Sequence, residues 1–228
     1  MSPPRTGATR GSMKRASRPL APLLAALSAV LVLGCALTSK SQPIQPRFFS
    51  PERSGAAPEP ASAPAPLAME LRIGHVTAAS YLDERMVFRD SPVELGYYQE
   101  RRWTEAPEEY VRRRIERALF EERGLRHVVG GSAPTLEVEL TAFEEIRNPK
   151  RIARVQVSAR LQDARLVRWE ETMTVDVPVA ASSKESSADE LVLALGDALT
   201  LMVNRLAERV TAELGAPPRL APSAEARK

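Results

Sequence analysis

The stretch that decides the fold is residues 134–179, with the sequence PTLEVELTAFEEIRNPKRIARVQVSARLQDARLVRWEETMTVDVPV. Apolar side chains recur there at every second position, and mostly polar or charged side chains stand between them. The apolar runs cover residues 136–140, 155–161 and 173–179. This alternation is typical of strands that are buried on one face, and the turn-forming stretches 148–150 and 163–165 separate the runs. The sequence therefore predicts an antiparallel meander of three strands.

Upstream of the meander, shorter runs predict further strands. The clearest covers residues 69–73, and weaker candidates are residues 86–88 and 94–98. Adjacent aromatic side chains at Phe48 and Phe49 stand in a proline-rich stretch, where we expect them to dock as a short edge strand rather than to remain in water.

Two segments have the 3.6-residue period of amphipathic helices instead. The first follows residues 104–107 (Thr-Glu-Ala-Pro), which offer a cap and an early-turn proline, and it ends at Gly124. Its outer face alternates acidic with basic residues, so the run Arg112–Arg114 is interpreted as a solvated face. The second follows a capping box at 187–190 and ends at Gly215. Its apolar stripe consists of Leu191, Leu195, Met202, Leu206 and Val210.

These elements together predict an α+β domain over residues 67–215, in which a mostly antiparallel sheet has two helices packed on one face. A domain of about 150 residues buries roughly 70% of the surface that its unfolded chain exposes. The chain has a single cysteine, which excludes an internal disulfide. Neither a disulfide nor a metal is needed to hold such a domain together.

The basic character of the chain belongs to its amino-terminal segment. The 228 residues have a formal net charge of +3. Residues 1–34 hold five of the 32 basic residues and none of the 29 acidic ones, so the rest has 27 basic against 29 acidic residues. Nucleic acid is therefore not an expected partner. Eleven of the 19 prolines precede residue 67, which places the start of the globular part near Leu67.

The same segment has the features of a lipoprotein signal peptide. Basic residues precede the apolar stretch 20–33, which is shorter than the roughly 20 residues that span a bilayer. Residues 32–35 (Val-Leu-Gly-Cys) look like a bacterial lipobox, in which Cys35 accepts a diacylglycerol and then an N-acyl chain such as palmitate. Ala36, in place of aspartate, favours transfer to the outer membrane. A buried cysteine in an uncleaved anchor is the alternative, and translation starts at Met1 or Met13.

The expected organisation has four parts. Residues 1–34 form the signal peptide, and residues 35–66 form a lipid-anchored tether, expected to be disordered because proline, alanine and serine dominate it. Residues 67–215 form the α+β domain, and residues 216–228 a disordered tail.

The residues that enzymes need are not found in a catalytic pattern. The sequence has none of the glycine-rich phosphate or dinucleotide motifs and no nucleophile elbow. His75 and His127 are its only histidines and lie far apart, so neither a metal nor another cofactor is expected. The adjacent acidic pairs at 121–122, 144–145 and 170–171 are the candidates for an acid/base couple. Adjacent residues of a strand point to opposite faces, so a strand pair cannot form an acid/base couple, and we expect no enzymatic activity.

Several short stretches resemble one known family. They are Pro46–Ser50, Leu71–Val76 with Ser80–Asp83, Met86–Arg89, Tyr97-Tyr98 leading to Arg102–Pro107, and the closing helix from Ala188. The chain is similar in these to the ABC-type transport auxiliary lipoprotein family, whose PqiC-like members accompany Mce-type (MlaD-type) lipid transport systems. The resemblance implies a periplasmic, non-catalytic auxiliary role at the outer membrane. The implied partner is an Mce-domain protein of the transporter, and homo-oligomeric rings are implied as an option.

Aromatic residues are favoured in interface cores, so Tyr97, Tyr98 and Trp103 are candidate partner-binding residues. Because the chain has few aromatics, the hydrophobic core is the alternative for each of them. Two other functions also stay open: a lipoprotein activator or scaffold of cell-wall enzymes, and direct carriage of a lipid. A carrier needs an apolar cavity of several hundred Å³. If the protein is a carrier, we expect this cavity between the helices and the sheet.

Overall fold

The computed structural model describes residues 44–52, 67–164, 166–180 and 188–216. The expected signal peptide, Cys35, most of the expected tether and nearly all of the expected tail lie outside these residues. The elements are β1 (Arg47–Phe49), β2 (Glu70–Ala78), β3 (Arg85–Ser91), β4 (Glu94–Trp103), α2 (Pro107–Glu116), the π-helical turn η1 (Arg117–Glu121), β5 (Arg126–His127), β6 (Thr135–Ile146), β7 (Ile152–Gln162), β8 (Val167–Pro178) and α3 (Ala188–Gly215).

The predicted meander is confirmed as β6, β7 and β8, which pair antiparallel in chain order. Leu140 pairs with Val157, and Val157 pairs with Met173. Cross-strand partners project to the same face of a sheet, so these three side chains form one row of the core. All three are buried. These two ladders are the longest in the sheet, which makes the sheet mostly antiparallel.

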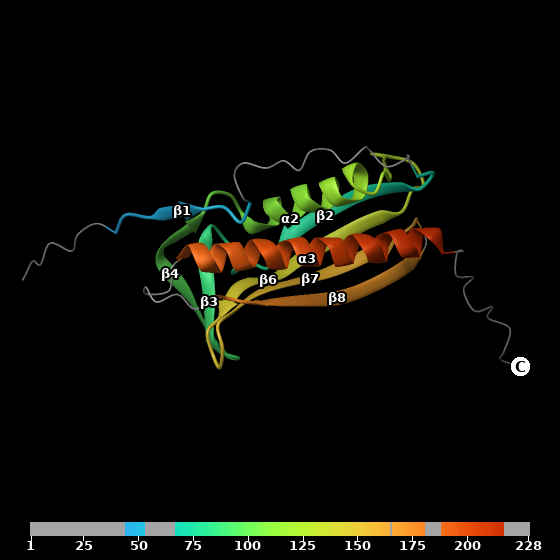
Figure 1. The fold of residues 1–228 in the computed structure, drawn as a ribbon. Coiled ribbons are helices and arrows are strands. Elements are labelled where there is room, and N and C mark those ends of the chain that lie inside the picture. Colours follow the sequence, from blue (N-terminus) through green and yellow to red (C-terminus); the bar gives the residue numbers. More distant parts are fainter. Residues whose placement is uncertain (1–43, 53–66, 165, 181–187, 217–228) are drawn as a thin grey trace, which may run out of the picture. The chain divides into compact units, whose positions relative to one another are not determined.

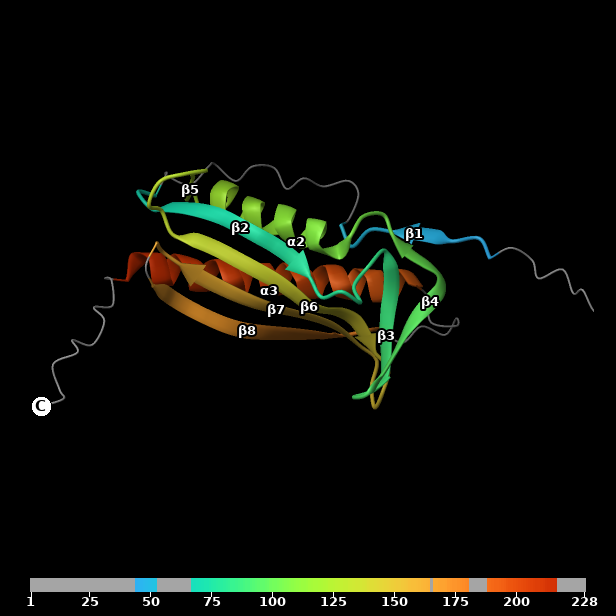
Figure 2. The same ribbon diagram turned by 180° about the vertical axis from the view of Figure 1, so that it is seen from behind.

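The other edge of β6 is shared by two strands. β2 pairs parallel with its first half, from Thr135 to Leu140, and β3 pairs parallel with its last residues, from Glu144 to Ile146. β4 returns antiparallel to β3, and β1 pairs parallel with the end of β4. Seen from behind, β3 and β4 cross the end of the sheet steeply (Figure 2). The carboxyl end of β6 therefore lies at a corner of the fold.

Both helices cover the same face of the sheet (Figure 1). The predicted stripe of α3 is buried throughout: Leu191, Leu195, Met202, Leu206 and Val210. Val111 and Ile115 of α2 and Leu119 of η1 are buried on the same side. These side chains join the inward faces of β6, β7 and β8 in one core cluster. The predicted architecture, an α+β domain with two helices on one face, is confirmed.

The beginning of α2 differs from the prediction. Its N-cap is Ala106, which makes no side-chain cap. The Thr104 hydroxyl instead shares a hydrogen bond of 2.7 Å with the Tyr110 hydroxyl. Thr104 thus fixes a core side chain rather than the helix end. After η1, Gly124 adopts a φ of +69°, which a residue without a Cβ reaches at little cost. Ser187 of the predicted capping box lies outside the described residues.

Residues 44–52 dock onto the domain, as expected for Phe48 and Phe49. β1 pairs with β4, and the amide of Thr104 donates a hydrogen bond of 2.9 Å to the carbonyl of Phe49. Pro51 then lies against α3 at Gly196, where an added Cβ would stand only 2.4 Å from the carbonyl oxygen of Pro51. A glycine is required at this close approach. The segment is held by both β4 and α3.

Candidate functional site

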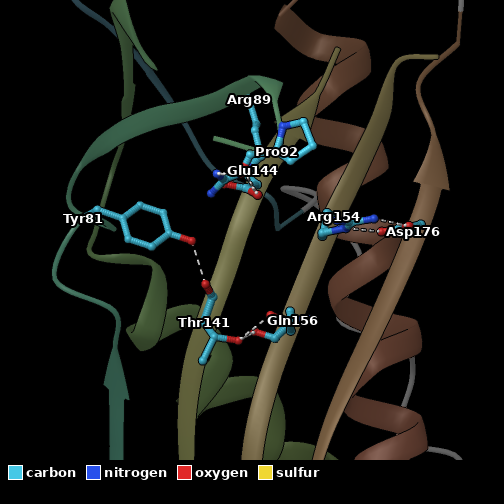
Figure 3. A network of polar contacts seen from close by, with 8 residues as sticks. All are labelled: Tyr81, Arg89, Pro92, Thr141, Glu144, Arg154, Gln156 and Asp176. Carbon is cyan, nitrogen blue, oxygen red and sulfur yellow. Dashed lines mark hydrogen bonds and ion pairs between the residues drawn. The ribbon is translucent and has the colours of Figure 1, made fainter. Parts of the chain in front are cut away.

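A groove of about 760 Å³ lies on the face of the sheet that the helices do not cover, next to the point where β3 pairs with the end of β6. Its lining comes from the loop before β3, the β3–β4 hairpin and the neighbouring strands β6 and β7 (Figure 3). The residues are Tyr81, Arg89–Pro92, Thr141, Ala142, Glu144, Ile146, Asn148, Pro149, Arg154 and Gln156. The wall combines the rings of two prolines and a tyrosine with charged and amide groups.

A buried ion pair ties β3 to β6 at the groove. The Arg89 guanidinium donates to both carboxylate oxygens of Glu144, from Nε at 2.9 Å and from Nη2 at 3.1 Å. Such a two-bonded pair is both stronger and more specific than a single contact. The hydrogen bonds to Glu144 raise the pKa of Arg89. The hydroxyl of Tyr81 donates to the carbonyl of Thr141 at 2.6 Å, and burial raises the pKa of Tyr81.

A β-bulge forms the floor of the groove. The register between β6 and β7 shifts between Leu140 and Ala142, which leaves Thr141 as an extra residue. The hydroxyl of Thr141 donates to the backbone carbonyl of Gln156 at 3.2 Å. Farther along, Arg154 donates two bonds of 2.8 Å to Asp176 of β8. Because its charged groups are paired, the floor offers polar atoms with little net charge.

The neighbouring glutamate faces the other way. The carboxylate of Glu145 is buried and accepts hydrogen bonds from the Tyr98 hydroxyl and from Nε of Arg151, the latter at 2.6 Å. Arg147 adds an ion pair with Glu145 at 3.6 Å. Burial, together with the bond to Glu145, raises the pKa of Tyr98, so this phenol remains a donor. The prediction that this adjacent acidic pair diverges is confirmed.

The second strand pair also diverges. Glu170 pairs with Arg160 at 2.8 Å, whereas Glu171 accepts from the indole nitrogen of Trp169 and pairs with Arg209 of α3. Both members of the third pair, at 121–122, are exposed and lie near Arg117. The described residues contain no group of three side chains suited to a metal ion. His127 stacks on Phe120 with ring centroids 4.5 Å apart.

The three candidate partner-binding aromatics occupy different environments. Trp103 is 1% exposed and packs between Tyr110 and Phe143, with ring centroids 6.3 and 5.0 Å away. The ring of Trp103 therefore lies in the hydrophobic core, which was the alternative expected for it. Large aromatic rings bury more apolar area than other side chains. The ring of Trp103 fills the corner between β4 and β6.

Tyr97 and Tyr98 are half-buried. The hydroxyl of Tyr97 donates to the carbonyl of Tyr81 at 3.2 Å, and the guanidinium of Arg85 lies 3.9 Å above its ring. The ring of Tyr98 meets Phe88 edge-on at 5.1 Å. Thus Tyr97 contacts the loop that lines the groove, and Tyr98 belongs to the buried network around Glu145.

The groove was not found from the sequence. Its floor depends on the bulge at Thr141, and its wall depends on the parallel pairing of β3 with β6, neither of which leaves a local pattern. One signal was present: Glu144 and Glu145 place two adjacent acidic residues in the strand, where they break the alternation of apolar and polar positions, and both are buried. Buried carboxylates need partners, and each of these has at least one arginine.

The fold and the site define an α+β domain with helices on one face of its sheet and a polar groove on the other. Residues 54–207 match the model of a family described as the ABC-type transport auxiliary lipoprotein component. This match spans more than half of the chain, and the protein belongs to that family.

Solved structures share the fold. Protein XCC0632 from Xanthomonas campestris is 22% identical, with a TM-score of 0.59 over 73% of this chain and 96% of that one. A second structure, of an uncharacterized protein, is 13% identical, with a TM-score of 0.55 over 73% of this chain and 99% of that one. A comparison with curated proteins gave no match. Among the described residues no helix is both long and apolar enough to cross a bilayer.

Proposed function

We propose that this protein is a non-catalytic lipoprotein of the outer membrane that faces the periplasm and serves as adaptor of an Mce-type ABC lipid transport system. The observation that carries the proposal is the family match over residues 54–207, together with the lipobox that ends at Cys35. Diacylglycerol and an N-acyl chain on Cys35 hold the chain on the membrane, since two or more acyl chains give stable anchoring.

The absence of catalysis is supported by the way in which charged groups are arranged. In the described part of the chain, the adjacent acids on β6 and on β8 point to opposite faces and are bound to arginines. A general acid and a general base must both reach one substrate. Groups that are paired for structural reasons support a protein that acts by binding.

The groove is the surface that we assign to the transporter, with Tyr97 contributing to its support and Tyr98 to the network behind it. Its occupant is an extended segment of the periplasmic Mce-domain protein. The prolines at the rim offer apolar contact, and the floor around Thr141 and Gln156 offers partners for backbone amides. Val93, at the tip of the β3–β4 hairpin, is 94% exposed beside this groove.

Direct carriage of a lipid by this domain is disfavoured by two observations. The space between helices and sheet, where we expected a cavity for a carrier, is occupied by the buried side chains of the core cluster. The groove on the opposite face is lined by Arg89, Glu144 and Arg154, which suit a polar contact rather than an acyl chain. A scaffold of cell-wall enzymes is the alternative that a partner experiment must separate.

The test is photocrosslinking in growing cells. A photoreactive amino acid replaces Val93 in one strain and Val129 in the other. Val129 is 89% exposed but belongs to the loop between β5 and β6, far from the hairpin. We expect crosslinks to an Mce-domain protein from position 93 and few from position 129. Crosslinks from position 93 to a cell-wall synthase instead, or equal products from both positions, contradict the proposal.

A further inference from the structure

An exposed apolar patch lies at the edge of the sheet, on the segment nearest to the expected lipid. Ile44 is 56% exposed and Phe48 is 60% exposed. Neighbouring strand residues point to opposite faces, so Phe48 turns away while Phe49 packs against the core cluster. Phe48 is therefore exposed because of its position on the strand and not because the core is incomplete, since the adjacent Phe49 is packed against the core cluster.

Arg102 lies beside Phe48 on the same face, and two further arginines lie on the opposite face of β1 and β4. Across the β1–β4 pairing, Arg47 stands opposite Arg101 and Phe48 stands opposite Arg102. Arg47 lies with its guanidinium 5.1 Å from the ring of Phe49, and Arg102 donates to the carbonyl of Tyr98 at 2.9 Å. Neither Arg47 nor Arg102 forms an ion pair with another described residue. β1 and the last four residues of β4 hold three arginines against one acid, Glu100.

The patch is held in place by the folded domain. The pairing of β1 with β4 fixes the strand, and the close approach of Pro51 to Gly196 fixes the residues that follow. Glu52 adds an ion pair with Arg113 of α2 at 3.4 Å. Side chains on a segment anchored at three places have a defined direction, so Phe48 and Arg102 act as parts of one surface.

Covalent geometry limits how far this surface can be from a bilayer. Ile44 is nine positions after Cys35, and an extended chain advances at most about 3.6 Å per position, so the distance is at most about 32 Å. This step rests on the proposed acylation of Cys35. If Cys35 is acylated, a phospholipid surface is always within reach of the patch, whereas any protein partner must arrive by diffusion.

We propose that the β1 patch, formed by Ile44 and Phe48 with Arg102 of β4, rests on the phospholipid headgroups. Arg102 binds a lipid phosphate, and the two apolar side chains enter the boundary between headgroups and acyl chains. Acyl chains on Cys35 already supply the affinity for the membrane, so the patch determines how the domain is oriented on it. It turns the opposite end of α3, near Gly215, away from the bilayer (Figure 1).

The experiment uses the acylated protein, purified from membranes and reconstituted into vesicles of phosphatidylethanolamine and phosphatidylglycerol. An environment-sensitive fluorophore is attached to a new thiol in Phe48→Cys or, as matched control, in Val129→Cys. The sulfur of acylated Cys35 is blocked and takes no label. We expect a several-fold higher emission from position 48 than from position 129, and a decrease when phosphatidylcholine replaces phosphatidylglycerol. The change Arg102→Glu should lower the emission from position 48.

Equal, water-like emission from both positions overturns the membrane contact and leaves the patch to a protein. This failure differs from a failure of the proposed anchoring. A protein without acyl chains does not remain with the vesicles at all, so flotation of the vesicles separates the two results. High emission from position 48 that is unaffected by Arg102→Glu and by lipid charge overturns the assignment of Arg102 to a lipid phosphate.

Discussion

The two faces of the sheet are built on different principles. The face toward α2 and α3 is filled by apolar side chains and a few enclosed aromatics, of which Trp103 is the largest. The opposite face holds cross-strand polar pairs, such as Arg154 with Asp176, and the groove. Adjacent residues of one strand show the contrast, since Glu145 serves the first face and Glu144 the second. Stability is therefore concentrated on one face, which leaves the other free to evolve contacts.

The largest effect is expected on the covered face. Trp103→Ala should lower the free energy of unfolding by about 3–5 kcal/mol, because it removes an enclosed ring and leaves a cavity beside Tyr110 and Phe143. Chemical denaturation of the purified protein measures this difference. An unchanged denaturation midpoint would show that the ring is not part of the core.

The adjacent glutamates sharpen the comparison. Glu145→Gln should cost about 2 kcal/mol, because it weakens charged hydrogen bonds from Tyr98 and Arg151 in a buried site. Glu144→Gln should cost less, about 1 kcal/mol, because Glu144 has one hydrogen-bonded partner among the described residues, Arg89, whereas Glu145 has both Tyr98 and Arg151. Each variant is the control for the other. A reversed order of the two costs would contradict the distinction between the faces.

The contact of Pro51 with α3 is expected to be sensitive to one methyl group. Gly196→Ala places a Cβ on the carbonyl of Pro51, and overpacking of this kind costs about 1–3 kcal/mol, partly offset by the better helix propensity of alanine. The amide of Thr104 should then exchange its hydrogen faster, since its acceptor is Phe49 on the displaced segment. Gly215→Ala, at a position with open space, is the control. Unaltered exchange at Thr104 in Gly196→Ala argues against the docked segment.

The smallest effect is expected on the polar face. Arg154→Gln removes a cross-strand ion pair that is about one third exposed, and such pairs contribute about 0–1 kcal/mol. The melting temperature should stay close to that of the unchanged protein and should depend little on salt. A loss as large as that of Glu145→Gln would mean that the polar face also determines stability.

The parts of the fold that repeat over many residues could be predicted from the sequence. The alternation in β6, β7 and β8 and the helical stripe of α3 both follow from one-sided burial, which leaves a periodic mark. The predicted helix cap at Thr104 was wrong because the Thr104 hydroxyl forms its hydrogen bond with the Tyr110 hydroxyl and not with the backbone of α2. The pairing of β3 with β6 joins segments more than fifty residues apart, and only the folded chain defines it.

The site residues show the same limit. Trp103 could be narrowed to core or interface, but its enclosure depends on Phe143 from a distant strand. The divergence of Glu144 and Glu145 followed from strand geometry alone, whereas their arginine partners did not. The groove needs both a bulge and a corner, and so it could be found only from the arrangement of β3, β6 and β7.

The central claim is that this family member acts as a protein anchored through Cys35. The most direct measurement is metabolic labelling with palmitate in cells that produce the unchanged protein or Cys35→Ala. We predict label on the unchanged polypeptide, recovered with the outer membrane, and neither label nor membrane recovery for Cys35→Ala. An unchanged polypeptide that stays unlabelled, or a variant that still fractionates with the outer membrane, contradicts the account.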